Sequence, residues 1–249
     1  MNASIIIPTL NEEMGIVKTI NDIKMLNENY EILVVDGLSE DNTRENALSQ
    51  ALYDSNKGTY SSHSFRNNVK VISEERKGKG IAMKTGVENA TCNILVFIDG
   101  DGTYDVTNLP NIINKLDEYD VCVGSHNLKK EGAYSDMVMW TDHVFFPFIL
   151  KGISNRFNTS EPLTGFRVMK KETWYRLQLD ATDFGIELEM EHKMSVHKMN
   201  ILEFPIPCIP RIGGKSKFKT SFKTLYSMAK FIYIHRKEFK NTKVDIYDF

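Results

Sequence analysis

The sequence predicts an α/β fold in which helices flank a mainly parallel, Rossmann-like sheet. Short apolar runs alternate with helical patterns through the first half, as is typical of parallel strands joined by crossover helices. The chain has 249 residues, of which 41% are hydrophobic and 26% charged. This size and composition suit one folded domain with a substantial core and exclude a disordered chain.

Five apolar runs are expected to form strands: Ser4–Ile7, Glu31–Val35, Val69–Ile72, Ile94–Ile98 and Val121–Val123. Helical periodicity predicts helices between them: Glu13–Asn27, Asp41–Leu52, Lys79–Glu88 and Leu109–Tyr119. Their expected N-caps are Ser39 or Asp41, and Thr107. In the less regular second half we expect a helix, a strand and a final helix: Glu187–Met199, Ile201–Ile206 and Ser221–Arg236. No Pro-, Gly- or Ser-rich linker divides the chain.

The C-terminal segment is basic, although the formal net charge of the chain is −2. From Arg211 to the end, ten Lys and Arg side chains stand against three Asp and Glu. Residues 218–249 are predicted to form a basic amphipathic helix and tail, which either lies at an anionic membrane surface or packs on the domain. Because the basic residues do not continue onto the acidic body, no nucleic-acid partner is expected.

No apolar run reaches the roughly 18 to 20 residues that cross a bilayer, and the N-terminus carries no signal-peptide pattern. We therefore expect a cytoplasmic protein that is peripheral at the cytosolic face of a membrane. Whether a membrane protein is its partner stays open.

Acidic residues follow three of the predicted strands. Glu12 comes after the first strand, Asp36 closes the second, and the sequence Asp99-Gly100-Asp101 follows the fourth. The carboxyl ends of parallel strands meet at one rim, where α/β sheets bind ligands. Two carboxylates at this spacing suit Mg²⁺ or Mn²⁺ that keeps positions open for diphosphate oxygens. The sequence thus predicts a nucleotide and metal site at this rim.

In their order, these motifs resemble those of family 2 glycosyltransferases, which have the GT-A fold. The first three motifs are residues 5–13 (IIIPTLNEE), 34–43 (VVDGLSEDNT) and 99–101 (DGD). Residues 123–125, 163–167 and 211–217 resemble the dolichol-phosphate mannose synthase branch and its polyprenyl-phosphate relatives. The resemblance implies a GT-A domain at residues 1–217, with a nucleotide-sugar half to about residue 125 and an acceptor half at 126–217.

The resemblance also implies roles for single residues. The nucleotide sugar would be bound by Pro8, Leu10, Glu12, Asp36, Asp99, Gly100 and Asp101. Asp99 and Asp101 would hold the metal, with Thr103 as a further contact where relatives commonly have Gln. The acceptor or its phosphate would meet His126, Arg167, Arg211 and Lys217, and His126 stands where relatives often have Arg. Catalysis would rest on Asp99, Asp101, Arg211 and Lys217.

The resulting functional prediction is transfer of a hexose, with inversion, from a GDP- or UDP-linked sugar to a polyprenyl (dolichyl) phosphate. A phosphate is already ionised near neutral pH, so no strong general base is needed. One alternative is extension of a saccharide or lipid-linked glycan. It would require a carboxylate base, for which Glu187 and Glu189 are the candidates, unless they are helix-surface residues. The other is a non-catalytic nucleotide-sugar-binding protein, which the intact pair of aspartates disfavours.

Overall fold

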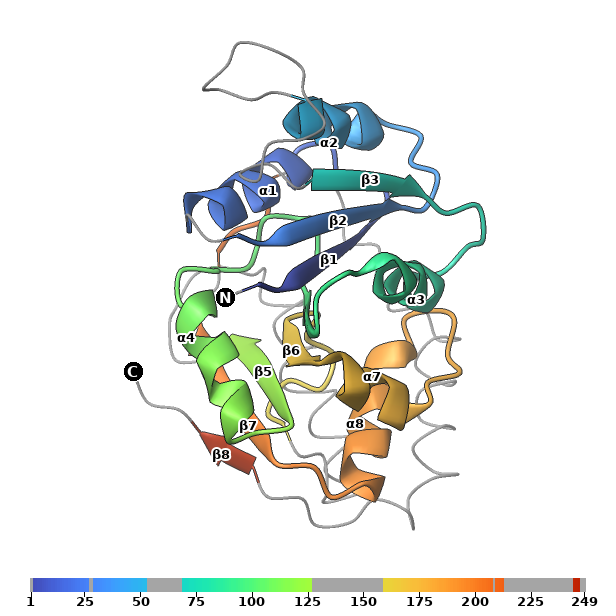
Figure 1. The fold of residues 1–249 in the computed structure, drawn as a ribbon. Coiled ribbons are helices and arrows are strands. Elements are labelled where there is room, and N and C mark those ends of the chain that lie inside the picture. Colours follow the sequence, from blue (N-terminus) through green and yellow to red (C-terminus); the bar gives the residue numbers. More distant parts are fainter. Residues whose placement is uncertain are drawn as a thin grey trace.

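The computed structural model describes residues 2–26, 29–52, 69–126, 159–207, 209–212 and 244–246. These residues form one eight-stranded sheet in the order β3-β2-β1-β4-β6-β5-β7-β8. Figure 1 shows the sheet running through the molecule, with helices along it on either side. The predicted α/β class is therefore confirmed.

The first four strands are parallel and match the predicted apolar runs closely. They are β1 (Ser4–Thr9), β2 (Glu31–Asp36), β3 (Val69–Ser73) and β4 (Ile94–Phe97). β1 lies between β2 and β4, which places the ends of all three at one rim. The central strands are buried on both faces and so appear as near-continuous apolar runs in the sequence.

The second half of the sheet contains one strand that runs against the others. Its strands are β5 (Val121–His126), β6 (Arg167–Lys170), β7 (Ile201–Ile206) and β8 (Val244–Ile246). β6 pairs antiparallel with both β4 and β5, whereas β5, β7 and β8 pair in parallel. The sequence did not predict β6, because only two apolar residues stand between its charged ends, Arg167 and Lys170. The sheet is nevertheless mainly parallel, as predicted.

Helices cover both faces of this sheet. Side chains of α1 (Ile16–Met25), α2 (Thr43–Leu52) and α4 (Leu109–Asn114) pack into one core. Side chains of α3 (Lys79–Asn89), α7 (Lys171–Leu177) and α8 (Ile186–Val196) pack into the other. A 3₁₀ turn, η1 (Lys115–Asp117), follows α4.

The predicted helix starts were less accurate than the helices themselves. The N-cap of α4 is Asn108 and not Thr107, whose N–H and hydroxyl both donate to Asp105. At α2, which begins at Thr43, the N-cap position is Asn42 and not Ser39 or Asp41; Asp41 accepts the N–H of Thr43 from one residue further back. These differences arise because Asx turns compete with caps for the same backbone donors.

Several predictions lie outside the described residues. They concern Lys217, the final helix at 221–236 and most of the tail at 218–249. Within that predicted tail, residues 244–246 are described and form the edge strand β8. Among the described helices, none is both long enough and apolar enough to pass through a bilayer.

Gly86 is the point of closest approach between α3 and the sheet. A Cβ atom there would lie 2.3 Å from Cγ2 of Ile6 on β1. We predict that Gly86→Ala destabilises the protein by about 1–3 kcal/mol, as overpacking does. Helix propensity alone predicts the opposite, a gain of about 1 kcal/mol. Thermal unfolding distinguishes the two expectations. Glu88→Ala, on the exposed face of the same helix, is the control. A higher Tm for Gly86→Ala than for the wild type would contradict the prediction.

Candidate functional site

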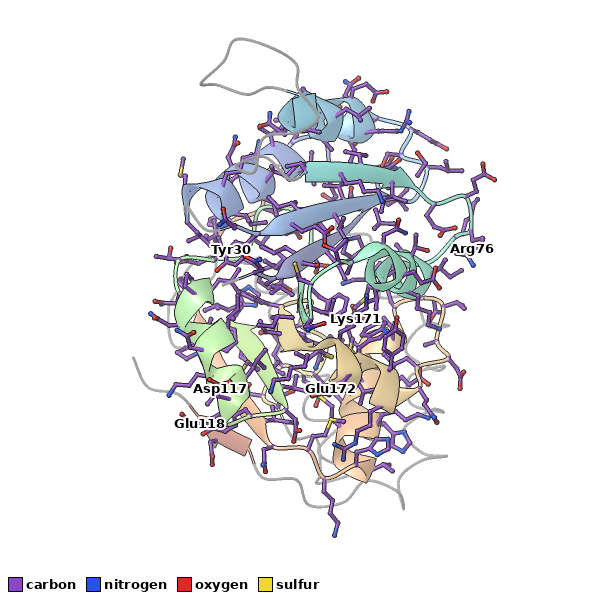
Figure 2. All side chains as sticks on the ribbon, viewed as in Figure 1. Tyr30, Arg76, Asp117, Glu118, Lys171 and Glu172 are labelled. Carbon is purple, nitrogen blue, oxygen red and sulfur yellow. The ribbon has the colours of Figure 1, made fainter. Side chains whose placement is uncertain are left out.

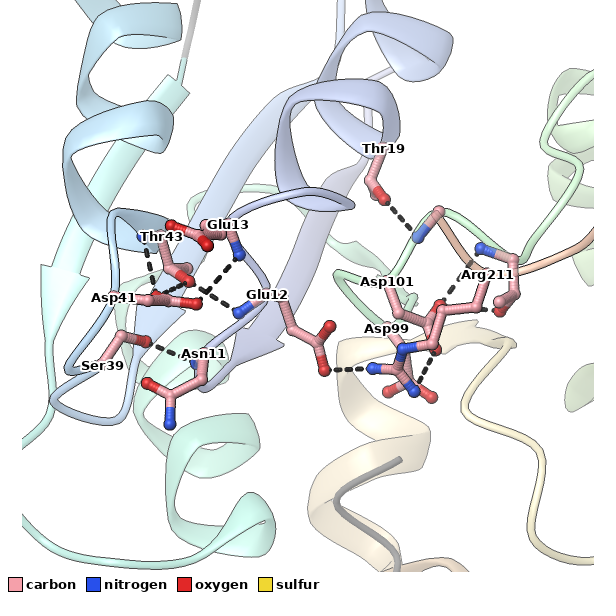
Figure 3. A network of polar contacts seen from close by, with 12 residues as sticks. Asn11, Glu12, Glu13, Thr19, Ser39, Asp41, Thr43, Asp99, Asp101 and Arg211 are labelled. Atoms are coloured by element: carbon pink, nitrogen blue, oxygen red, sulfur yellow. Dashed lines mark hydrogen bonds and ion pairs between the residues drawn. The ribbon is translucent and has the colours of Figure 1, made fainter. Parts of the chain in front are cut away.

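The loops that follow β1 and β2 are bonded to each other at the rim. The N–H of Asn11 donates to Oγ of Ser39 at 2.8 Å, and the N–H of Glu12 donates to Oγ1 of Thr43 at 2.6 Å (Figure 3). Asn11 and Leu38 both have left-handed backbones, with φ of 50° and 60°. Such strain persists only where surrounding contacts hold it, and it is often found at ligand sites.

Asp36 is buried beneath these loops. Its carboxylate accepts the N–H and the hydroxyl of Ser39, so it shapes the loop between β2 and α2. Its predicted contact with a base or ribose stays a prediction. Above it, Leu10 and Leu38 leave apolar surface exposed at the rim, and Pro8 lies on β1 below Leu10. Exposed leucines beside a strained turn offer the kind of surface on which a nucleobase packs.

Asp99 and Asp101 follow β4 and reach the same rim. The N–H and the hydroxyl of Thr103 donate to Oδ1 of Asp101 at 3.1 and 2.7 Å. Thr103 therefore braces Asp101, and its predicted metal contact stays untested. Between Asp101 and Thr103, Gly102 has a φ of 76°, and its N–H donates to Oγ1 of Thr19 (Figure 3).

A lysine that the sequence did not single out binds Asp99. Nζ of Lys79, the first residue of α3, lies 2.6 Å from Oδ1 of Asp99 and 2.7 Å from Oε1 of Glu187 in α8. Burial by itself would lower the pKa of Lys79, but these two carboxylates outweigh it and raise the pKa above its usual value. Lys79 is thus a cation at any physiological pH. Its position beside a Gly-Lys-Gly helix start was the available signal in the sequence.

Arg211, which was predicted to bind phosphate, lies beside the other aspartate. Its guanidinium forms an ion pair with Glu12 and lies 3.4 Å from Oδ2 of Asp101 (Figure 3). Burial would lower the pKa of Arg211, but Glu12 and Asp101 raise it. Residues from opposite ends of the chain therefore converge on one cluster of charges.

The two aspartates suit a divalent ion of the Mg²⁺ or Mn²⁺ type. Their side chains stay 28% and 16% exposed, for Asp99 and Asp101, so hard carboxylate oxygens face the solvent at the rim. Within the described ranges no three His, Cys, Asp or Glu side chains group as a complete metal site. Mg²⁺ that binds together with a nucleotide is usually held by one or two protein carboxylates, and water and diphosphate oxygens fill its other coordination positions.

A second contact of Asp99 connects it to the predicted acceptor half. The Tyr104 hydroxyl lies 3.5 Å from Oδ2 of Asp99 and accepts the N–H of Gly165 at 2.9 Å. A Cβ at Gly165 would lie 2.5 Å from Asp99, so only glycine fits there. The buried His126 ring stacks on Tyr104, and its Nδ1 lies 2.9 Å from Oε1 of Glu161.

Arg167 was predicted at the acceptor but is enclosed in the protein. Its side chain is 0% exposed; it donates to Oε1 of Glu191 and to the carbonyl of Pro162, both at 2.8 Å. This buried pair joins β6 to α8. These contacts explain Arg167 as a structural residue in the described part of the chain, and its predicted contact with the acceptor stays a prediction.

Glu187 and Glu189 are not helix-surface residues, so that interpretation was wrong. Both are buried in the first turn of α8. Glu189 accepts the N–H groups of Asp180 and Ala181 and so fixes the preceding loop. Burial raises the pKa of Glu187, an effect that Lys79 opposes. Of the two, only Glu187 is connected to Asp99.

The Arg167–Glu191 pair provides a test of its structural role. We predict that Arg167→Met costs about 3–5 kcal/mol of stability, because it leaves Glu191 as an unpaired buried charge. The double variant Arg167→Met/Glu191→Leu should recover most of that loss, since neither charge remains. Denaturant unfolding measures both. A single variant as stable as the wild type would show that the pair does not hold α8 in place.

Comparisons with known proteins show which family this chain resembles. A family model described as glycosyl transferase family 2 matches residues 4–175. The dolichol-phosphate mannosyltransferase of Pyrococcus furiosus is 28% identical over 240 residues, which cover 94% of this chain and 63% of that protein. The undecaprenyl-phosphate mannosyltransferase of Micrococcus luteus is 26% identical over 226 residues, 87% of each chain.

A hexosyltransferase of low-salt glycan biosynthesis from Haloferax volcanii is 28% identical over 217 residues. The match covers 84% of this chain and 48% of that protein, so this chain spans about half the length of that relative. Among solved structures, glucosyl-3-phosphoglycerate synthase of Mycobacterium tuberculosis with Mn²⁺, UDP and glucosyl-3-phosphoglycerate has a TM-score of 0.65. It is 17% identical, over 97% of this chain and 81% of that one. At this identity the likeness shows a shared fold.

Proposed function

The chain belongs to glycosyl transferase family 2, and from this premise we propose that it transfers a hexose, with inversion, from a GDP- or UDP-linked sugar to a polyprenyl phosphate. The observation that carries the proposal is the meeting of Asp99 and Asp101 with two cations, Lys79 and Arg211, at the carboxyl ends of the parallel strands. A nucleoside diphosphate requires this combination of metal ligands and positive charge.

In the proposed reaction, an oxygen of the acceptor phosphate attacks the anomeric carbon while the bond to the nucleoside diphosphate breaks. Mg²⁺ or Mn²⁺ held by Asp99 and Asp101 would supply neutralisation of the leaving diphosphate. Tyr104 and Thr103 hold the two carboxylates in place. Arg211 adds a fork of donors for phosphate oxygens, and Lys217 is proposed beside it on sequence grounds.

Two observations support a phosphate acceptor. The relatives from Pyrococcus and Micrococcus are named for transfer to dolichol phosphate and undecaprenyl phosphate, and the C-terminal segment of this chain is basic. On this basis we also propose peripheral attachment at the cytosolic face of a membrane, with His126 in the acceptor half. A membrane-protein partner remains part of the proposal.

The alternative with a hydroxyl acceptor is less favoured. It requires a carboxylate that is free to remove a proton from the acceptor. Glu187 is held 2.7 Å from the Lys79 ammonium and is buried, while Glu189 is bonded to backbone N–H groups. Neither candidate base is thus available in the described arrangement, whereas a phosphate acceptor needs none.

The proposal predicts glycolipid formation that depends on a divalent ion. The full chain should convert one member of a panel of radiolabelled GDP- and UDP-hexoses, with a short polyprenyl phosphate and Mg²⁺ or Mn²⁺, and EDTA should stop the reaction. Asp101→Ala should lower kcat at least about 100-fold, because the metal contributes several kcal/mol to the transition state. Asp105→Asn, four residues further on, is the matched control.

Other outcomes would redirect the proposal. Transfer to a free saccharide alone would favour the hydroxyl acceptor, and transfer to phosphoglycerate alone would show that the acceptor is a phosphate without a lipid. Nucleotide binding with no product for any acceptor would favour the non-catalytic alternative.

A further inference from the structure

Each aspartate of the metal pair shares a cation with a second carboxylate. Lys79 lies between Asp99 and Glu187, at 2.6 and 2.7 Å. Arg211 lies between Asp101 and Glu12, and the guanidinium is 3.4 Å from Asp101. The same pattern therefore occurs twice, with residues from five separate segments of the chain (Figure 3 shows the Arg211 half).

Both cations contact the carboxylates that would bind a metal ion. An ammonium at 2.6 Å from Asp99 already neutralises the oxygen that a divalent ion would bind, and only 12% of the Lys79 side chain is exposed. Water therefore screens this contact poorly, and displacing it is costly. A metal ion that binds by itself must therefore compete with both cations for the two carboxylates. Among the carboxylates of the described residues, the cations then keep the ion pairs with Glu187 and Glu12.

We propose that Lys79 and Arg211 are internal counterions that suppress metal binding until a nucleoside diphosphate arrives and takes over their charge. The inference deepens the proposed function and rests on it for the identity of the diphosphate. Glu187 and Glu12 are the positioning residues of this arrangement, because they keep the two cations beside the aspartates while their partners are exchanged.

Diphosphate oxygens are suitable replacement partners for both cations. An arginine fork and a lysine ammonium form charge-assisted hydrogen bonds with phosphate as readily as with carboxylate. Once they have moved, Asp99 and Asp101 are free to bind the metal, and the metal in turn contacts the same diphosphate. By linkage, the nucleotide must then raise the affinity for metal by the same factor as the metal raises the affinity for nucleotide.

The test is a titration of Mn²⁺, followed by electron paramagnetic resonance of the free ion, with and without saturating GDP or UDP. For the wild type, we expect one nucleotide to raise Mn²⁺ affinity by roughly 5–150-fold, the range of ordinary coupling. For Lys79→Met we expect tighter Mn²⁺ binding without nucleotide, by about tenfold, and a smaller effect of nucleotide. Glu187→Gln should do the reverse and weaken binding of Mn²⁺ alone, because Lys79 then pairs with Asp99 only.

Lys171→Met is the matched control. Lys171 (labelled in Figure 2) donates to the carbonyl of Ala90, next to the amino end of β4 and so at the far end of that strand from Asp99. It should leave Mn²⁺ affinity as in the wild type. Should Lys79→Met fail to fold, as judged by its thermal transition, Arg211→Met tests the other half of the pattern and is expected to change Mn²⁺ binding in the same direction.

The outcomes separate this inference from the proposed function. Equal Mn²⁺ affinity in Lys79→Met, Arg211→Met and wild type, or wild-type binding that no nucleotide changes, would overturn the inference even where glycolipid is formed. The expected Mn²⁺ pattern without any glycosyl product would support the inference and count against the proposed acceptor.

Discussion

The parallel pairing of β1 with β2 and β4 is the constraint on which the site depends. The register places Thr9 beside Asp36 and Ile6 beside Phe97, so the three strands end at the same rim. The loops that follow these strands therefore lie close together, although they are far apart in the sequence. Glu12, Asp36 and Asp99 gather there because their strands are buried on both faces and cannot slip without exposing apolar side chains.

Without nearby positive charge, these carboxylates would repel one another. Lys79 and Arg211 supply that charge, and each draws its second partner from another segment, Glu187 in α8 or Glu12 after β1. The start of α3 is also bonded to the loop before α8, because the N–H of Ile81 donates to the carbonyl of Thr182. The Lys79–Glu187 ion pair therefore also joins the start of α3 to α8.

The sequence predicted those parts of the fold and site that depend on local pattern. Apolar runs located β1 and β4 to within two residues, and Asp99 and Asp101 were placed at the rim because they follow β4. β6 was missed because only two of its four residues are apolar, and its antiparallel direction is set by tertiary pairing alone. Lys79 was missed because nothing local marks its partner, Glu187, which lies 108 residues away in the chain.

Arg167 and Arg211 show what sequence could not decide. Both belong to motifs that suggest phosphate binding, yet Arg167 is fully enclosed with Glu191 and a carbonyl, while 24% of the Arg211 side chain is exposed beside Asp101. A buried pair that loses one partner leaves an uncompensated charge, so Arg167 cannot exchange Glu191 for a ligand without a large loss of stability. Arg211 has two carboxylate partners and contact with solvent, so it can release one of them to a phosphate. Whether an arginine serves the fold or the ligand thus depends on whether its partner can be replaced, and only the three-dimensional arrangement decides that.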